Sequence, residues 1–502
     1  MKCPPLLALA SLSSLFSATT ALHGLKAKLK SNFDNRQNSQ SSASSPGVFL
    51  SSFSSPAEAQ AAAKVDFSDL NWDQEQYAGY LTFTGDRGAN ATSPVINSFF
   101  WLFESLDGNI DAPILIWLQG GPGGSSLYGA FEEIGAMGMD ENGDIYNREE
   151  LNNWNQHYAL LIIDNPVGVG FSFSNDKDCY VTDEKQVASD LYSAMQEFYK
   201  SFPERRSSEL YITGESYAGK YIPALGYTIM TNNQKNDPQQ PNINLKGVSI
   251  GDGAMNPPTQ FLDYGNLLFY AGMADQAERE IYNSYEDKIK DCLSSNDDAG
   301  NVCAFEQFDE MLNGDFYPYP TFYTNHTGLT NYFNFEQGDC GSCDVEKYGD
   351  WVTSDDVRNR IGVGNIPYFD FNETVEENLK EDWMRGVVDM LVPLMESKDI
   401  KVLIYSGQND IILGPPLTEN FLNSLEWSGS DQWKSSEKQV WSIKDSGSVL
   451  FKNDPVAGYS TSVSDGTSYW GFEYKVVRGA GHMVPLDQPE RTYNMITEFV
   501  SL

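Results

Sequence analysis

Three residues far apart in the chain have the types needed to activate a hydroxyl group for nucleophilic attack. Ser216 lies in the segment Leu210-Tyr-Ile-Thr-Gly-Glu-Ser-Tyr-Ala-Gly, between an apolar run and a predicted helix. A serine on a sharp strand-to-helix turn needs small neighbours, here Gly214 and Ala218, so that its oxygen projects from the turn. The usual pattern has glycine at the second of these positions. On this motif alone, an ordinary helix N-cap serine remains an alternative interpretation.

The base and the acid are identified by their positions after predicted strands. Among the four histidines, His482 directly follows an apolar strand, and Asp410 ends the segment Val402-Leu-Ile-Tyr-Ser-Gly-Gln-Asn-Asp. The order serine, acid, histidine along the chain is that of α/β-hydrolases. Asp263, or another acid of the middle segment, is a less well placed competitor for the role of Asp410. The sequence therefore predicts a Ser216, Asp410, His482 triad.

A glycine-rich loop is the predicted oxyanion hole. The segment Trp117-Leu-Gln-Gly-Gly-Pro-Gly-Gly-Ser-Ser follows an apolar strand. Acyl transfer needs two backbone N–H groups directed at the developing oxyanion, one from the residue after the nucleophile and one from an early loop. We expect Tyr217 and Gly121 to supply them. A phosphate-binding loop would need a following Gly-Lys-Ser/Thr, which is missing here.

Short apolar runs alternate with a helical pattern along the chain. These elements must position Ser216, Asp410 and His482. Several runs are apolar throughout, which is typical of strands buried on both faces of a parallel sheet. Glu184 to Tyr199 repeats apolar residues at helical spacing. The expected strands lie at 80–83, 99–103, 114–118, 160–163, 210–213, 248–250, 401–405, 440–443 and 472–477, and a closing helix lies at 490–502. The pattern predicts an α/β fold with a mainly parallel central sheet.

The domain organisation follows from shifts in composition. Residues 1–21 have a lysine, an apolar run and small residues, which is typical of a signal peptide. Residues 22–65 are rich in small and polar residues, so we expect a flexible leader or propeptide. Residues 66–502 form the predicted domain, with a large helical and irregular insertion, a cap, at about 256–395. No internal repeat is apparent.

The net charge and the sequons indicate a protein of the secretory pathway. A formal charge of −37 disfavours nucleic acid and anionic membranes as partners. No later run reaches the ~18 apolar residues that a membrane helix needs. Sequons at Asn90, Asn325 and Asn372 are predicted glycosylation sites. We expect release in soluble form, to the extracellular space or to a lysosome or vacuole.

The cysteines predict disulfides rather than a metal site. Cys3 would leave with the signal peptide, and four of the other five cluster in the middle of the chain. Two local disulfides with three possible connectivities are expected, with Cys179 left over. Zinc is the alternative, but the ligand spacing is poor. The clustered residues are Cys292, Cys303, Cys340 and Cys343.

Five motifs in order resemble the signatures of the serine carboxypeptidase family. They are WLQGGPGGSS, DNPVGVGFSFS, GESYAGKYIPA, VLIYSGQNDII and GAGHMVPLDQP, and they span most of the chain from Tyr77 to Phe499. Within the family, the chain most resembles the vitellogenic-like carboxypeptidases. The resemblance implies an α/β-hydrolase without cofactor or metal, which removes C-terminal residues from peptides through an acyl-enzyme at acidic pH, as a monomer or homodimer.

The resemblance also implies a set of residues that bind the substrate. Family members hold the terminal carboxylate with an amide, a glycine N–H and two glutamic acids that share protons, which correspond here to Gln119, Gly120, Glu133 and Glu215. A protonated glutamic acid can donate to the substrate carboxylate, so we expect tighter peptide binding at acidic pH. The family pattern commonly has Asn at 119 and Cys at 124, where this chain has Gln and Gly. The implied pocket-lining residues are Trp117, Tyr217, Tyr128, Glu132 and Met483.

Alternatives remain for several of these roles. Glu133 and Glu215 could be solvated acids, although Glu215 directly precedes Ser216, and a surface role for Glu132 is an alternative to contact with a basic C-terminal residue. For the whole chain, the alternatives are acyl transfer to an acceptor other than water, a non-catalytic binding protein, and a lipase or endopeptidase. The complete set Ser216, Asp410 and His482 argues against a non-catalytic protein.

Overall fold

One large sheet runs through the chain. The computed structural model describes residues 47–88, 93–139, 144–148, 153–176, 178–317, 320–338, 347–443, 456–464 and 470–501. In these residues, eleven strands pair in the order β1-β2-β3-β7-β4-β8-β9-β10-β13-β12-β11. The sheet strands in chain order are β1 (Lys64–Phe67), β2 (Trp72–Thr84), β3 (Val95–Phe103), β4 (Ile114–Leu118), β7 (Ala159–Ile163), β8 (Leu210–Glu215), β9 (Leu245–Gly251), β10 (Lys401–Gly407), β11 (Gln439–Ser442), β12 (Val456–Ser464) and β13 (Trp470–Val477).

The centre of the sheet is parallel and its two flanks are antiparallel. The six strands from β7 to β13 in sheet order pair in parallel. The pairs β1–β2, β2–β3, β3–β7, β12–β13 and β11–β12 are antiparallel. The α/β fold predicted from the apolar runs is therefore confirmed. Because the central strands are parallel, their carboxyl ends lie at one edge, where ligands bind in such sheets.

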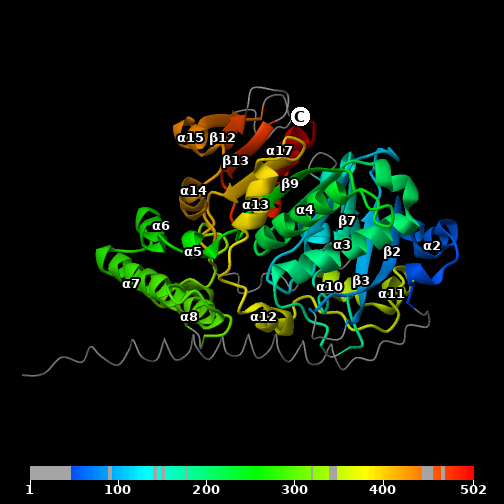
Figure 1. Cartoon of the computed structure of the whole chain (residues 1–502), viewed down its shortest axis with the longest axis horizontal. Coiled ribbons are helices and arrows are strands. Elements are labelled where there is room, and N and C mark those ends of the chain that lie inside the picture. Colours follow the sequence, from blue (N-terminus) through cyan, green and yellow to red (C-terminus); the bar gives the residue numbers. More distant parts are fainter. Residues whose placement is uncertain are drawn as a thin grey trace, which may run out of the picture.

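Both faces of the sheet are buried. Along β4, Ile114 and Ile116 belong to one apolar core, whereas Leu115 and Trp117 belong to the other. Helices α3 (Glu184–Ser201), α4 (Ala218–Lys235) and α13 (Val388–Met395) cover the first face (Figure 1). Helix α17 (Pro489–Ser501) contributes Met495, Ile496 and Phe499 to the second core. This double burial explains why the strand sequences are apolar throughout.

The predicted insertion lies between β9 and β10. Its outer helices α7 (Gln276–Leu293) and α8 (Asp298–Phe308) project from one end of the molecule (Figure 1). It is not a separate fold, because Phe308 and Trp383 belong to the same core as the sheet. The other helices of the insertion are α5 (Pro257–Gln260), α6 (Tyr264–Tyr270), α9 (Phe322–Thr327), α10 (Lys347–Val352), α11 (Asp355–Arg360) and α12 (Glu373–Leu379), with the π-helix η6 (Asp309–Asn313).

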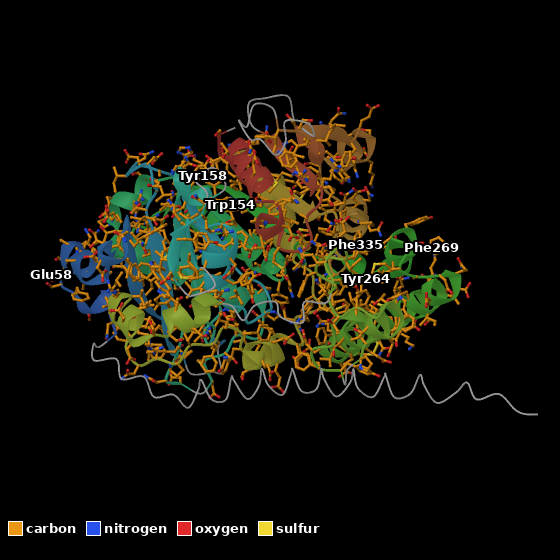
Figure 2. The ribbon with its side chains drawn as sticks, turned by 180° about the vertical axis from the view of Figure 1, so that it is seen from behind. Glu58, Trp154, Tyr158, Tyr264, Phe269 and Phe335 are labelled. Carbon is orange, nitrogen blue, oxygen red and sulfur yellow. A yellow bond between two sulfur atoms is a disulfide. The ribbon has the colours of Figure 1, made fainter. Side chains whose placement is uncertain are left out.

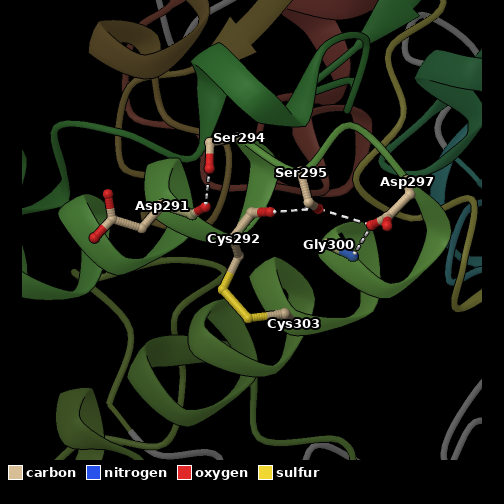
Figure 3. Close-up of a disulfide and its surroundings, with 7 residues drawn as sticks. All are labelled: Asp291, Cys292, Ser294, Ser295, Asp297, Gly300 and Cys303. Carbon is tan, nitrogen blue, oxygen red and sulfur yellow. Dashed lines mark hydrogen bonds between the residues drawn. A yellow bond between two sulfur atoms is a disulfide. The ribbon is translucent and has the colours of Figure 1, made fainter.

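A disulfide joins α7 to α8. Cys292 near the end of α7 is bonded to Cys303 in α8 (Figure 3). Asp297, which lies between the two cysteines in the chain, accepts a hydrogen bond from the Gly300 N–H and caps the N-terminus of α8. One of the two predicted local disulfides is thus present. Cys340 and Cys343 lie outside the described residues, and Cys179 is a buried free thiol.

The last part of the predicted leader is ordered in the structure. Residues 47–65 are folded onto the sheet body: Leu50 is 4% exposed, and the ring of Phe49 stacks on Tyr80 with centroids 5.0 Å apart. Helix α2 (Pro56–Ala63) buries Ala59, and β1 pairs with β2. This segment has few large apolar side chains of its own, but the core of the sheet body supplies the surface against which it packs. Residues 1–46 lie outside the described part.

The remaining elements flank the sheet. Strands β5 (Met137–Met139) and β6 (Ile145–Asn147) pair separately as a small hairpin. No helix of the described residues is both long and apolar enough to cross a membrane. The short helices are η1 (Leu50–Ser52), η2 (Ser68–Leu70), η3 (Gly129–Glu133), η4 (Trp154–Gln156), η5 (Pro203–Ser207), α14 (Pro415–Ser424), α15 (Ser430–Ser435) and α16 (Val484–Asp487).

Candidate active site

Ser216 lies on a strained turn at the carboxyl end of the central strand β8. Its φ of 63° is in the left-handed region, which is unfavourable for a residue with a side chain. The turn is held by backbone hydrogen bonds, from the Ser216 N–H to Gly251 O at 3.0 Å and from the Ala254 N–H to Ser216 O at 3.0 Å. The side chain is partly exposed, whereas its neighbours on both sides are buried. This arrangement is that of a nucleophile elbow rather than of a helix N-cap.

The small residues around Ser216 are explained by close backbone contacts. A Cβ atom at Gly214 would lie 2.1 Å from Leu118 O, and one at Gly219 would lie 2.6 Å from Ala254 N. Ala218 is fully buried with its methyl group. Alanine is therefore tolerated at position 218, because the close contact with the loop after β9 is made one residue later, by Gly219.

Asp410 and His482 meet at the ends of two neighbouring parallel strands. Asp410 follows β10, His482 follows β13, and these strands pair directly. His482 Nδ1 lies 2.9 Å from Asp410 Oδ2, and the two residues are 2% and 0% exposed. An ionised carboxylate accepts, so Nδ1 carries the proton and Nε2 is left as an acceptor. Asp263, the competing acid, instead accepts hydrogen bonds from Asn266 and Asn420.

The second ring nitrogen of His482 is available. In the part of the chain that the structure describes, Nε2 is buried and has no hydrogen-bond partner, and no hydrogen bond joins it to Ser216. Such bonds are commonly long without substrate and tighten in the complex. A buried ring nitrogen without a partner is costly unless a reacting group uses it.

The insertion holds the loops that carry Asp410 and His482. The His482 N–H donates to Phe333 O at 2.7 Å, and the Phe335 N–H donates to Asn409 O at 3.1 Å. The rings of Phe333 and His482 pack with centroids 5.1 Å apart. Figure 2 labels Phe335 on the inner side of the insertion and Phe269 near its outer end. The insertion thus orients the imidazole in addition to covering the sheet edge.

The glycine-rich loop after β4 packs directly against the nucleophile. A Cβ atom at Gly120 would lie 2.6 Å from both Ser216 Cβ and Tyr217 N, so only glycine fits there. The N–H groups of Gly121 and Tyr217 have no acceptor in the described residues. Asp164 holds the loop from behind, since its carboxylate accepts from the Ser125 hydroxyl at 2.7 Å and the Ser126 N–H at 3.2 Å.

A chain of side chains leads from Trp117 to a pair of buried glutamic acids. The Trp117 indole donates to Gln119 Oε1 at 2.8 Å, and Gln119 Nε2 donates to Glu215 Oε1 at 2.8 Å. Glu133, on η3, and Glu215 are each 1% exposed. Apart from the contact between the two carboxyl groups, both oxygens of Glu133 and Oε2 of Glu215 have no hydrogen-bond partner among the described residues. Two buried carboxylates without donors are unfavourable, so the pair must hold a proton.

The pKa values of Glu133 and Glu215 are both raised, as expected for carboxyl groups that keep a proton. Burial raises the pKa of Glu215 to about 8, against a lowering by hydrogen bonds from Gln119 and Glu133. Burial, then the charge of Glu215 and a hydrogen bond to it, raise the pKa of Glu133 well above its usual range. A proton shared between Glu133 and Glu215 satisfies both, since one carboxyl donates and the other accepts. We therefore expect the pair to keep a proton at acidic and neutral pH.

The residues expected to line the pocket fall into two groups. Tyr128, Glu132 and Met483 are partly exposed. Trp117 and Tyr217 are 0% and 1% exposed, so their side chains support the site from behind instead of presenting open surface. The π-helix η3 covers the Trp117 indole, and the Tyr217 hydroxyl contacts Lys220 and Asp382. Their role in lining the pocket stays a prediction.

The predicted glycosylation sites differ in exposure. Asn325 is exposed on α9. Asn372 is 7% exposed, its Oδ1 caps α12, and its Nδ2 donates to Gly168 O at 2.8 Å. The nitrogen that would carry a glycan therefore donates a hydrogen bond inside the fold, which disfavours glycosylation at Asn372. Asn90 lies outside the described residues.

One acid at this site was not predicted. Asp252 directly follows β9, between the ends of β8 and β10, and is fully buried. The signal that identified Asp410, an acid just after an apolar strand, is equally present in Val248-Ser-Ile-Gly-Asp. Only one orienting acid is needed for a triad, so the second was not assigned.

Comparisons with known proteins agree with this geometry. A family model described as serine carboxypeptidase matches residues 67–502. The chain is 40% identical over 426 residues to a probable serine carboxypeptidase CPVL of Dictyostelium discoideum, with 84% of this chain and 79% of the relative covered. It is 39% identical to the venom serine carboxypeptidase of Apis mellifera, with 84% of each chain covered. It is 33% identical to the vitellogenic carboxypeptidase of Aedes aegypti, with 88% and 86% covered.

A solved structure supports the fold. The prohormone-processing carboxypeptidase Kex1(Δ)p from Saccharomyces cerevisiae aligns with a TM-score of 0.67 at 22% identity, covering 89% of this chain and 97% of that one. At this identity the likeness establishes the α/β-hydrolase fold alone. The family match and the curated relatives carry the assignment further. The chain belongs to the serine carboxypeptidase family and is a serine-type carboxypeptidase, a hydrolase that releases C-terminal amino acids from peptides.

Proposed function

We propose that Ser216 is the nucleophile of this carboxypeptidase, His482 its general base and Asp410 the acid that orients the imidazole. The observation that carries this assignment is the 2.9 Å contact between His482 Nδ1 and Asp410 Oδ2, buried at the sheet edge that also bears the elbow of Ser216. With Nδ1–H directed at the carboxylate, Nε2 is in the form that accepts a proton.

The reaction then proceeds in two acyl-transfer steps. Ser216 Oγ attacks the carbonyl carbon of the last peptide bond while His482 Nε2 takes its proton. The N–H groups of Gly121 and Tyr217 stabilise the oxyanion. The imidazolium protonates the leaving amine, so the C–N bond breaks and the terminal amino acid departs. Water, deprotonated by the same Nε2, then hydrolyses the ester on Ser216.

Exopeptidase specificity is assigned to the carboxyl pair and its neighbours. Gln119 and the Gly120 N–H are proposed to bind the substrate carboxylate together with Glu133 and Glu215. The raised pKa of Glu215, about 8, supports this role, because a protonated carboxyl donates to an anion whereas an ionised one repels it. A lipase or endopeptidase has no use for such a pair beside the nucleophile.

The residues around the departing amino acid are proposed to be Tyr128, Glu132 and Met483, all of them partly exposed. Trp117 and Tyr217 would shape the other side of the scissile bond through their packing. Glu132 would favour a basic C-terminal residue. Arg148 weakens that preference, because its positive charge interacts with the charge of Glu132.

Two measurements test the proposal. A fluorophosphonate should label Ser216 once per chain, and a Ser216→Ala variant should stay unlabelled with an unchanged thermal midpoint. A peptide library incubated at pH 5 should shorten from the carboxyl end alone, as seen by mass spectrometry. A folded protein that reacts at a different serine, or that cuts internal bonds, would refute the assignment.

We also propose passage through the secretory pathway. The Cys292–Cys303 disulfide and the exposed sequon at Asn325 support an oxidising, glycosylating compartment. Endoglycosidase treatment of protein expressed in a eukaryotic host should lower its mass at Asn325 and leave Asn372 unmodified. A glycan at Asn372 would contradict the described packing of α12.

A further inference from the structure

A second buried aspartic acid lies behind the proposed triad. Strands β9 and β10 pair in parallel, and each is followed by an acid, Asp252 after β9 and Asp410 after β10. One carboxylate oxygen of Asp252, one of Asp410 and a ring nitrogen of His482 all lie within 4.8 Å of one another. Both acids are 0% exposed. The site therefore contains two carboxyl groups where a triad needs one.

The hydrogen bonds of the two acids differ. Both oxygens of Asp252 face the Gly407 N–H, at 2.9 and 3.1 Å, which is one donor for two oxygens. Asp410 has separate partners for its oxygens, the Ile412 N–H at 2.9 Å and the His482 ring at 2.9 Å. Among the described residues, no lysine or arginine forms an ion pair with either acid. Asp410 thus has one N–H partner for each carboxylate oxygen, as an anion requires, whereas Asp252 has a single N–H partner for both oxygens.

Two adjacent anions in a buried site without a cation are strongly unfavourable, and retention of one proton removes the repulsion. Burial first, then the charge of Asp410 and a hydrogen bond to it, raise the pKa of Asp252 well above its usual range. The other groups facing Asp252 do not supply positive charge in the resting site. They are Glu215 at the end of β8, Tyr405 on β10, Tyr474 on β13, and His482 in the loop after it.

We propose that Asp252 is a positioning residue that keeps its proton and donates it in a hydrogen bond to Asp410, so that a neutral acid holds the triad carboxylate against His482. This inference rests on the proposed role of Asp410. Asp252 does not touch the substrate. It acts by fixing one carboxylate orientation and by leaving a single negative charge to stabilise the imidazolium.

The test is the pH dependence of kcat for an ester substrate without a free carboxylate, which is independent of the Glu133–Glu215 pair. Asp252→Asn replaces a protonated acid by a neutral donor of the same shape. We expect kcat within about threefold of the wild type and an acid limb, which reports protonation of the imidazole, that stays within ~0.3 pH unit. Asp252→Leu has no donor and should lower kcat by about tenfold or more.

Two results would overturn the proposal. If Asp252 were ionised, its replacement by Asn would remove a negative charge near His482, destabilise the imidazolium and move the acid limb to lower pH by about 0.5 unit or more. An Asn variant as impaired as the Leu variant, at an unchanged thermal midpoint, would also exclude the donor role. If Asp252→Asn does not fold, the smaller neutral Asp252→Ser is subject to the same criterion for the acid limb.

Failure of the proposed catalytic assignment gives a different result. In that case, the wild-type protein does not hydrolyse the ester or is not labelled at Ser216 by a fluorophosphonate. The comparison of the two Asp252 variants is made only with an active, labelled wild type, so a shifted acid limb then counts against Asp252 alone.

Discussion

Two pairs of buried acids flank the nucleophile, and they differ in what they face. Glu133 and Glu215 lie beside the glycine-rich loop, where a substrate carboxylate is proposed to bind, and apart from each other three of their four oxygens have no partner in the part of the chain that the structure describes. Asp252 and Asp410 lie behind the imidazole, and each of their oxygens faces a backbone or ring N–H. Both pairs are almost completely buried.

The comparison shows that a proton kept by a pair of buried acids can serve two purposes. In each pair, burial and a like charge favour retention of a proton. On the substrate side, the carboxyl oxygens that have no partner among the described residues allow the proton to turn toward a ligand, so its loss should raise KM. On the histidine side, the proton is enclosed among protein groups, so it should affect kcat through geometry and not through binding.

The largest expected effect separates the two members of the histidine-side pair. Asp410→Asn should lower kcat by about 10⁴-fold, because an amide no longer selects the tautomer with a free Nε2. Asp252→Asn is the matched control, with the same chemical change one strand away and only a small expected loss. Steady-state kinetics with a blocked dipeptide at pH 5 compares them. Similar losses in both variants would mean that the two acids share one role.

The next effect concerns the substrate-side pair. Glu215→Ala should raise KM for a blocked dipeptide roughly 10- to 100-fold, because a hydrogen bond to a charged group is lost. The kcat/KM for an ester without a carboxylate should be nearly unchanged. Glu280→Ala, at an exposed acid on α7 away from the site, serves as the control. Equal loss on both substrates would assign Glu215 to the structure of the elbow.

The pH dependence of KM should follow the same pair. Since the pKa of Glu215 is raised to about 8, its donor proton is present at pH 5 to 7 and is lost as the pH rises through about 8. We expect KM for a blocked dipeptide acid to rise about tenfold or more between pH 6 and pH 9. The same dipeptide as a C-terminal amide has no carboxylate, and its KM should stay flat. A flat profile for the acid would remove the carboxyl pair from substrate binding.

The smallest effect is on stability, and it extends the comparison to acids away from the site. Burial raises the pKa of Asp164 to about 6, of Glu473 to about 7 and of Glu376 to about 10. Above pH ~4.3 the unfolded chain releases these protons while the folded chain retains them, so stability falls as the pH rises toward each folded value. The thermal midpoint should be about 5 °C or more lower at pH 8 than at pH 5.

A pair of variants on α12 sharpens this stability prediction. Glu376→Gln has no proton to lose and should flatten the dependence of the thermal midpoint on pH. Replacement of the exposed Glu377, on the same helix, by Gln should leave the dependence of the thermal midpoint on pH unchanged. A midpoint that rises from pH 5 to pH 8 in the wild type would contradict the assigned direction of these pKa shifts.

The fold could be predicted where burial on two faces left a strong signal. The expected strand 114–118 matches β4 at both ends, and the helix expected from Glu184 begins there. Strand β12 was missed because Val456–Ser464 is rich in Ser, Thr and Gly, which suits a flank of the sheet that is only partly covered. The folded segment 47–65 was missed because its few apolar residues find their partners in distant strands.

The residue types after each strand, the small residues of the elbow and the glycine-rich loop are local properties, and the sequence alone determined them. Local sterics set strand ends and tight turns, so Ser216, Asp410 and His482 could be identified without coordinates. The burial of the four acids, the position of Asp252 beside Asp410 and the packing of Asn372 against Gly168 were decided by the tertiary structure alone. These properties depend on desolvation and on partners that come from distant parts of the chain.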